Sequence, residues 1–159
     1  MGAVVDGRRG LTTVFSDIPT QICHFHQMKR VTKYLTRRPE SVEGQELRQI
    51  MLTLPRTTEQ VFTEALDTWY TQHKTYVEQK SYLHGNSWHY THRSVRSAYY
   101  SLKRNLPFLF TYQKYPHLNI PNTTNSADGS FSSLKKKVAA HGGLRRDRRY
   151  QIIRALLQL

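Results

Sequence analysis

The stretch Ala3-Val4-Val5-Asp6-Gly7-Arg8-Arg9-Gly10 begins with apolar residues and then turns abruptly polar. A short apolar run that ends at Asp-Gly is typical of a buried strand followed by a turn. The sequence therefore predicts a strand over residues 3–5, with Asp6 at its carboxyl end. An aspartate placed there can project into a cleft at the edge of a sheet, or it can serve only as a turn residue or helix cap.

A second aspartate, Asp128, lies in the polar segment 122–131, close to the start of a helix expected from about residue 126. Lys135 follows it seven residues later, two turns along the same helical face. Two carboxylates that folding brings together can hold divalent metal over a phosphodiester, because hard cations prefer oxygen ligands. A solvated helix face would show the same Asp–Lys pair, so the spacing alone leaves both interpretations open.

The chain between these two segments is mostly helical by its pattern. Apolar residues recur at spacings of three and four from His26 to about Tyr82, which predicts several helices. The other expected elements are a short helix within 8–16, a strand-like stretch at 21–25, a loop at 83–91, and helices at 93–105 and 145–158. Trp69, the pair Tyr99-Tyr100 and the cluster Phe108–Phe110 are expected in the core, with Trp88 in its polar loop as the candidate exception.

The composition is strongly basic, with 24 Lys and Arg against 11 Asp and Glu in 159 residues, a formal charge of +13. Such an excess suits a polyanionic partner, because Lys and Arg neutralise phosphates and release counterions. No apolar run approaches the roughly 20 residues that span a bilayer, and no signal peptide is recognised. The single cysteine, Cys23, suits a reducing compartment. We therefore expect a soluble, intracellular, basic domain.

The positive charge is concentrated after residue 128, where eight Lys or Arg residues accompany one acid. A solvated basic face and contact with phosphate both remain open for this segment. The candidate DNA-contacting residues are Arg8, Arg9, Asn125, Lys135, Lys136, Arg145 and Arg146.

The spacing Cys23-x-x-His26 is half of a zinc-binding pattern. No C-x-x-C or H-x-H pair follows it in the sequence, although scattered histidines could complete a site. The pattern favours a packed strand end with a polar contact over zinc, and we treat it as a motif of uncertain role.

Taken in order, these segments resemble the mutator-like bacterial insertion-sequence transposases, whose catalytic domain has a ribonuclease H-like fold. Val4–Gly7 is similar to the sequence around the second catalytic aspartate of that family, and Cys23–His26 is similar to its C-x-x-H motif. Thr123–Asp128 resembles the segment that carries the third acidic residue, which is usually glutamate. The chain differs in having aspartate at this third position and no counterpart of the first catalytic aspartate before Asp6.

The resemblance implies an α/β fold: a partial ribonuclease H-like catalytic domain with a large helical insertion, predominantly helical in this chain. Residues 1–26 would be the last strands of the core and residues 27–121 the insertion. Residues 122–159 would be the core helix with the third acidic residue, followed by a basic terminal helix. The chain would then be the C-terminal part of a truncated transposase.

The implied function is metal-dependent DNA strand cleavage and strand transfer during transposition. Asp6 and Asp128 would be the catalytic residues and the ligands of Mg²⁺ or Mn²⁺, and transposon ends and target DNA would be the partners. Without the first aspartate we expect little activity from the chain alone. A homo-oligomer is compatible with this function, a membrane is not expected, and the location would be the bacterial cytoplasm, near the nucleoid.

Two other interpretations stay open. The chain could be a non-catalytic basic DNA-binding remnant that modulates full-length transposase. It could also be a polypeptide that does not fold stably by itself, because the expected strand at residues 3–5 would leave a sheet edge exposed.

Overall fold

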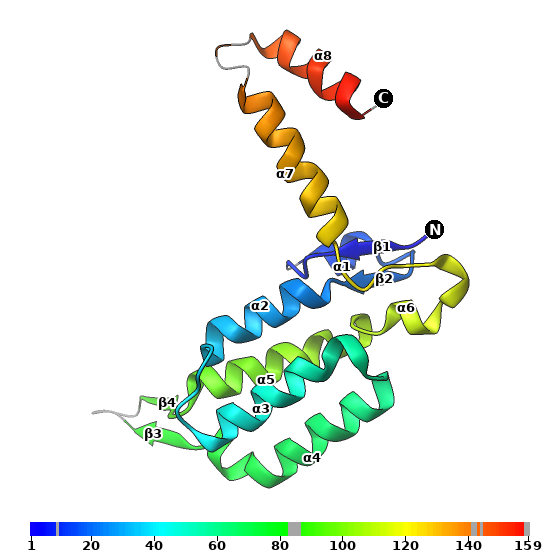
Figure 1. Ribbon diagram of the computed structural model, residues 1–159. Helices are drawn as coiled ribbons and strands as arrows, with labels where there is room; N and C mark the ends of the chain where they lie inside the picture. The colour runs from blue at the N-terminus through cyan, green and yellow to red at the C-terminus, as the bar shows by residue number, and fades with distance from the viewer. Residues whose placement is uncertain (9, 83–86, 141–142, 144, 158–159) are drawn as a thin grey trace. The chain divides into compact units, whose positions relative to one another are not determined.

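The computed structural model describes residues 1–8, 10–82, 87–140, 143 and 145–157 (Figure 1). It is mostly helical with a few short strands, so the expected predominance of helix is confirmed. The chain divides into two compact units, residues 1–123 and residues 124–159, which are described separately.

The first unit begins with a small parallel sheet. Strand β1 (Ala3–Val5) pairs with β2 (Thr20–Ile22), with Ala3 opposite Thr20 and Val5 opposite Ile22. The expected strand at 3–5 is confirmed, and a short helix, α1 (Leu11–Val14), lies in the crossover between the strands. Because the strands are parallel, their carboxyl ends lie at the same edge of the sheet. Asp6 and Cys23 follow those two ends directly.

Four longer helices form most of the first unit: α2 (His24–Leu35), α3 (Val42–Thr53), α4 (Glu59–Val77) and α5 (Arg93–Asn105). Local capping fixes two of their starts, since the side chain of Ser41 accepts a hydrogen bond from the amide of Gly44 and that of Thr58 accepts one from Val61. Helix α2 packs against α3 and α5, and α4 packs against the same two helices (Figure 1). The remaining short helices are η1 (Leu54–Arg56), η2 (Leu106–Phe108), α6 (Thr111–Lys114) and η3 (Pro116–Leu118).

The core of this unit lies between the four helices and extends to the sheet. Trp69, Tyr99 and Phe110 are buried, as the sequence predicted for them, whereas Tyr100 and Phe108 are partly buried against the core. Trp69 stacks on Tyr99 with ring centroids 5.5 Å apart. Trp88 is exposed. The other large buried side chains include Leu47, Met51, Leu54, Phe62, Leu66, Leu102 and Leu109.

Two expectations for local structure are wrong. The strand-like stretch at 21–25 ends at Ile22, and helix α2 begins at His24. The amide of Cys23 still donates to the carbonyl oxygen of Val5 at 2.8 Å, but the backbone beyond Val5 turns away at Gly7, which has a φ of +73°. The second strand therefore has no partner to continue along.

The second error concerns residues 80–90, which were expected to end a helix and then form a loop. They contain an antiparallel pair, β3 (Lys80–Tyr82) and β4 (Trp88–Tyr90), while residues 83–86 lie outside the described part. Aromatic residues favour strands, and the Lys80 ammonium group lies 4.1 Å from the centre of the Trp88 ring.

The second unit consists of α7 (Asn125–Ala140) and α8 (Arg146–Leu157), which confirms the two helices expected there. The expected stop at Gly142-Gly143 is described only in part: Gly142 lies outside the described residues, and Gly143 has a φ of +82°. Within the described ranges, no helix combines the length and apolar character needed to cross a membrane.

Candidate functional site

Asp6 closes a tight turn at the end of β1. Its Oδ1 accepts a hydrogen bond from the backbone amide of Arg8 at 3.0 Å, and its Oδ2 lies 2.8 Å from Nε of the same arginine. The Asp6 side chain retains 29% of its exposure, whereas that of Arg8 retains 81%. Asp6 therefore lies near the surface with a solvated cation over its carboxylate, and such an exposed pair is worth about 0–1 kcal/mol.

Gly7 lets the chain turn directly behind this carboxylate. Residues other than glycine rarely adopt its φ of +73°, and a Cβ here would meet Ile22 Cγ2 at 3.2 Å. Nη1 of Arg30, on α2, donates a hydrogen bond to the Gly7 carbonyl oxygen at 2.9 Å. The turn that carries Asp6 is thus fastened to helix α2.

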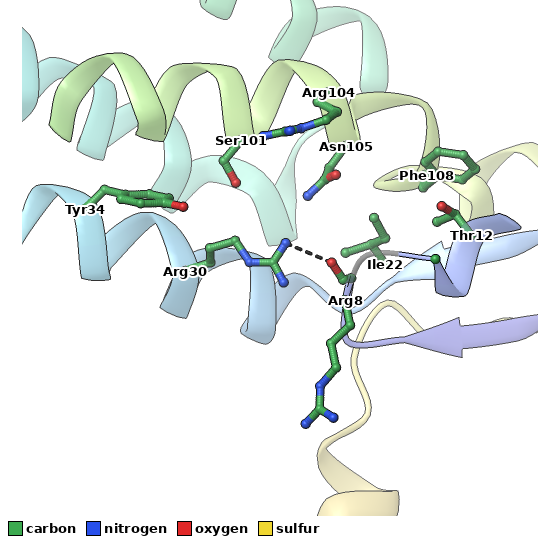
Figure 2. A pocket seen from close by; sticks show the side chains of 11 residues that line it. Arg8, Thr12, Ile22, Arg30, Tyr34, Ser101, Arg104, Asn105 and Phe108 are labelled. Carbon is green, nitrogen blue, oxygen red and sulfur yellow. Dashed lines mark hydrogen bonds between the residues drawn. The ribbon is translucent and has the colours of Figure 1, made fainter. Parts of the chain in front are cut away.

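Behind this turn lies a cavity of about 370 Å³ with a polar, basic lining (Figure 2). Arg30 comes from α2, and Arg104 comes from α5 on the other side. The Arg8 side chain points away from Ser101 and Arg104 in Figure 2, in keeping with its pairing to Asp6. The other lining residues are Gly7, Gly10, Thr12, Ile22, Tyr34, Asn105 and Phe108.

A buried glutamine holds two of the polar groups in this cavity in place. Gln27 is 1% exposed; its Nε2 donates to Ser101 Oγ at 3.2 Å, and its Oε1 accepts from Asn105 Nδ2 at 2.7 Å. Because the partners of Ser101 and Asn105 are fixed, their remaining hydrogen-bonding capacity points in defined directions. The cavity therefore has the features of an anion site: guanidinium groups with oriented neutral donors.

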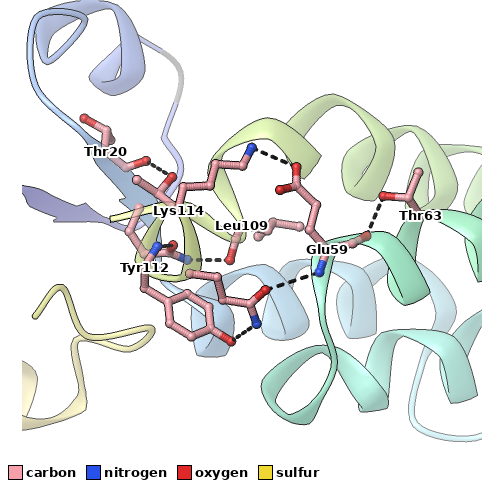
Figure 3. A network of polar contacts seen from close by, with 9 residues as sticks. Thr20, Glu59, Thr63, Leu109, Tyr112 and Lys114 are labelled. Carbon is pink, nitrogen blue, oxygen red and sulfur yellow. Dashed lines mark hydrogen bonds and ion pairs between the residues drawn. The ribbon is translucent and has the colours of Figure 1, made fainter. Parts of the chain in front are cut away.

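Buried polar contacts attach the sheet to the helices near this cavity (Figure 3). The Thr111 hydroxyl donates to the Thr20 carbonyl oxygen at 2.7 Å. Gln21 donates from Nε2 to the Leu109 carbonyl oxygen at 2.8 Å and accepts from the Tyr112 amide at 3.1 Å. Because Gln21 is fully buried on β2, these bonds satisfy its amide and fix the strand against α6.

The C-x-x-H residues lie where β2 passes into α2. Cys23 is buried at the N-cap position, and His26 is in the first turn of the helix. The structure describes no group of three or more His, Cys, Asp or Glu side chains that could hold a metal ion. A zinc site is thus not formed by the described residues.

His24, between the two motif residues, is fully buried and its Nε2 lies 2.6 Å from the carbonyl oxygen of Leu109. The carbonyl oxygen can only accept, so Nε2 carries a proton. Burial lowers the pKa of His24, and the hydrogen bond to Leu109 offsets part of that effect. His24 is therefore a neutral structural histidine that joins the start of α2 to the chain before α6.

The other predicted site residues are placed as follows. Arg9 lies outside the described residues, and so do the side chains of Asn125 and Asp128, which belong to α7 in the second unit. The basic residues of the second unit that the sequence pointed to are exposed, namely Lys135, Lys136, Arg145 and Arg146.

Sequence reasoning missed Arg30, Arg104 and the polar residues beside them. A signal was present: helices α2 and α5 contain seven Lys or Arg residues and no acid. The α5 segment repeats polar residues at intervals of four, at Ser97, Ser101 and Asn105, which places them on one helical face.

A divalent metal such as Mg²⁺ takes an octahedral set of oxygen ligands. Asp6 offers one carboxylate, and both of its oxygens already face Arg8. The described residues around Asp6 do not make a complete metal site. Comparisons of the chain with protein families, curated proteins and solved structures found no match.

Proposed function

We propose that this chain is part of a DNA transposase related to the mutator-like insertion-sequence transposases, with a partial ribonuclease H-like core. The observation that carries the proposal is the position of Asp6. It follows a strand of a parallel pair and adjoins Gly7 and Arg8, which line an arginine-rich cavity. A carboxylate beside groups that bind phosphate is the arrangement that phosphodiester chemistry requires.

The order of elements supports the same proposal. A strand ending in Asp6 is followed by a short helical crossover and a parallel strand, and then by the C-x-x-H residues at the start of α2. A helical segment follows, and α7 carries Asp128. In the proposed enzyme Asp6 and Asp128 serve strand cleavage and transfer with Mg²⁺ or Mn²⁺, and we expect little strand transfer from these two carboxylates alone.

A second candidate is a non-catalytic basic protein that binds DNA and modulates a complete transposase. The observation that favours it is the engagement of both Asp6 oxygens by Arg8, which is how an ordinary turn aspartate behaves. The net charge of +13 suits DNA under either candidate.

Binding of Mn²⁺ to the protein–DNA complex, followed by electron paramagnetic resonance, separates the two candidates. If Asp6 and Asp128 are ligands, Asp6→Asn and Asp128→Asn should each weaken binding about tenfold or more. The matched control is Asp17→Asn, at an exposed aspartate beside α1, which should change nothing. Unchanged Mn²⁺ binding in both variants, or plasmid nicking that survives their combination, would overturn the catalytic proposal.

A further inference from the structure

Charge is segregated among the four long helices of the first unit. Helices α2 and α5 pack side by side (Figure 1). They contain Lys and Arg residues but no Asp or Glu. Helices α3 and α4 together carry five acids against two strong bases. The basic residues of α2 and α5 are Lys29, Arg30, Lys33, Arg93, Arg96, Lys103 and Arg104. Lys103 pairs with Asp67 of α4, and Arg96 pairs with Glu78. The other five basic residues leave a positive field that would attract a polyanion.

Two adjoining cavities lie between α2 and α5. The first is the cavity behind the Asp6 turn, and the second, of about 430 Å³, extends toward the β3–β4 hairpin. Tyr34 and Arg104 line both, so the two cavities lie next to each other, and we call them together the α2–α5 groove. The second cavity is also lined by Tyr90, Arg93, Arg96, Ser97 and Tyr100.

Arg96 is already neutralised within the protein. Its guanidinium group pairs with Glu78 and lies 3.7 Å from the ring centre of Tyr90 and 4.4 Å from that of Tyr100. The Tyr100 hydroxyl donates to the same Glu78 oxygen at 2.9 Å. Arg96 thus has a structural role in the wall of the groove, and ligand binding falls to other residues.

Three other arginines keep their guanidinium groups available to a ligand. Arg93 and Arg104 are exposed, and within the described ranges of the chain their guanidinium groups have no hydrogen-bond or ion-pair partner. Arg30 uses only Nη1, toward Gly7, and its planar fork retains further donors. Arginine forks match phosphate oxygens in geometry as well as charge.

The spacing of these groups fits an extended ligand. Arg93 and Arg104 are separated by about 16 Å along α5, at 1.5 Å per residue, which corresponds to roughly five stacked nucleotides of one strand. Tyr34, between the two cavities, is 38% exposed and offers a ring face on which a base can stack. A small anion would fill only one of the two cavities.

We propose that the α2–α5 groove binds one DNA strand, with Arg30, Arg93 and Arg104 on its phosphates and Tyr34 against a base, and leads that strand to Asp6. The proposal rests on the proposed function in taking DNA as the partner. It assigns strand binding to the helical part of the first unit, separate from the basic helices of the second.

Fluorescence anisotropy with a labelled 12-nucleotide single strand and a duplex of equal length tests the groove. For the single strand, Arg93→Ala combined with Arg104→Ala should lower affinity about tenfold, and each substitution should reduce the salt slope by about 0.7. Tyr34→Ala should lower affinity about fivefold, while Tyr34→Phe should retain it. The matched control is Arg56→Ala, which removes one exposed arginine from η1.

Groove variants that bind the single strand like wild type, or no more weakly than Arg56→Ala does, overturn the groove while leaving the catalytic proposal in place. Losses confined to the duplex also overturn it, because the ligand assigned is one strand. Conversely, weaker DNA binding by the groove variants, together with unchanged Mn²⁺ binding in both Asp6→Asn and Asp128→Asn, would sustain the groove and refute catalysis. Thermal unfolding by circular dichroism confirms that each variant is folded.

Discussion

Arg30 and Gly7 are joined by a hydrogen bond of 2.9 Å between Nη1 of the arginine and the carbonyl oxygen of the glycine, 23 residues apart in sequence. Through this bond helix α2 holds the turn that displays Asp6. The same arginine lines the cavity behind the turn. A ligand that draws on the remaining donors of Arg30 would therefore act on the group that positions Asp6.

Gly7→Ala should destabilise the first unit by about 1–2 kcal/mol, because alanine resists a φ of +73° and its Cβ would press on Ile22 at 3.2 Å. Urea unfolding measures the change. Gly129→Ala is the matched control: nothing lies within 4 Å of a Cβ there and the residue is in helix α7, so alanine should be neutral or mildly stabilising. Equal effects of the two substitutions would show that the turn tolerates a side chain.

Glu78→Gln should destabilise the protein by about 1–2 kcal/mol at pH 7, since the carboxylate accepts charge-assisted bonds from Arg96, Tyr70 and Tyr100. Burial alone would raise the pKa of Glu78, but these bonds outweigh it and the pKa is lowered from 4.5.

The lowered pKa of Glu78 determines in which direction the stability of the protein changes with pH. The stability that Glu78 contributes is present above pH 4.5 and is lost as the pH falls through the folded-state pKa. The difference between wild type and Glu78→Gln should therefore shrink in acid, as measured by urea unfolding between pH 7 and 3. Glu64→Gln, at an exposed glutamate of α4 bonded to Gln60, should show little difference at any pH. A stability difference between wild type and Glu78→Gln that stays constant across this pH range would mean that the charge of Glu78 does not stabilise the protein.

His24 should make the protein less stable below neutral pH. Burial lowers its pKa from 6.5, so the unfolded chain takes up a proton more readily, and stability present above pH 6.5 is lost as the pH falls. His24→Gln should flatten that part of the stability profile, measured by urea unfolding at pH 8 and at pH 5.5. His117→Gln, at an exposed histidine of η3, should leave the profile as in wild type. A wild-type profile in His24→Gln would contradict the buried neutral state.

The local sequence pattern was sufficient to predict the bounds of an element where those bounds depend on the element's own residues. The strand at 3–5 and the helix at 93–105 were predicted with the bounds that the structure has, because an apolar run ending at Asp-Gly and a regular amphipathic repeat are local signals. The strand expected to run through Cys23 to Phe25 failed because its length is set by its partner, which turns away at Gly7.

In the candidate site, too, the features set by neighbouring residues could be predicted and those set by tertiary packing could not. Asp6 could be placed at a strand end from its neighbours alone. Arg30 and Arg104, by contrast, lie on helices far apart in sequence, and only the packing of α2 against α5 brings them to one cavity. The contact of Arg96 with the ring of Tyr90 likewise depends on a hairpin that the sequence did not predict.

The basic helices of the second unit give the last prediction. Lys135, Lys136, Arg145 and Arg146 are all exposed, as a solvated face and a phosphate-binding face would both require. If they contact phosphate, replacing all four by alanine should lower affinity for duplex DNA and reduce the salt slope by about 3.6, because each lost phosphate contact removes about 0.9.

The control for nonspecific loss of charge is the double substitution Arg56→Ala with Lys74→Ala, at exposed sites of η1 and α4. Anisotropy titrations between 50 and 200 mM salt, about the range over which such contacts dominate, measure both slopes. A slope change per removed charge that equals the control would identify the second unit as a solvated basic face. A larger change per removed charge than in the control would mean that α7 and α8 hold the duplex.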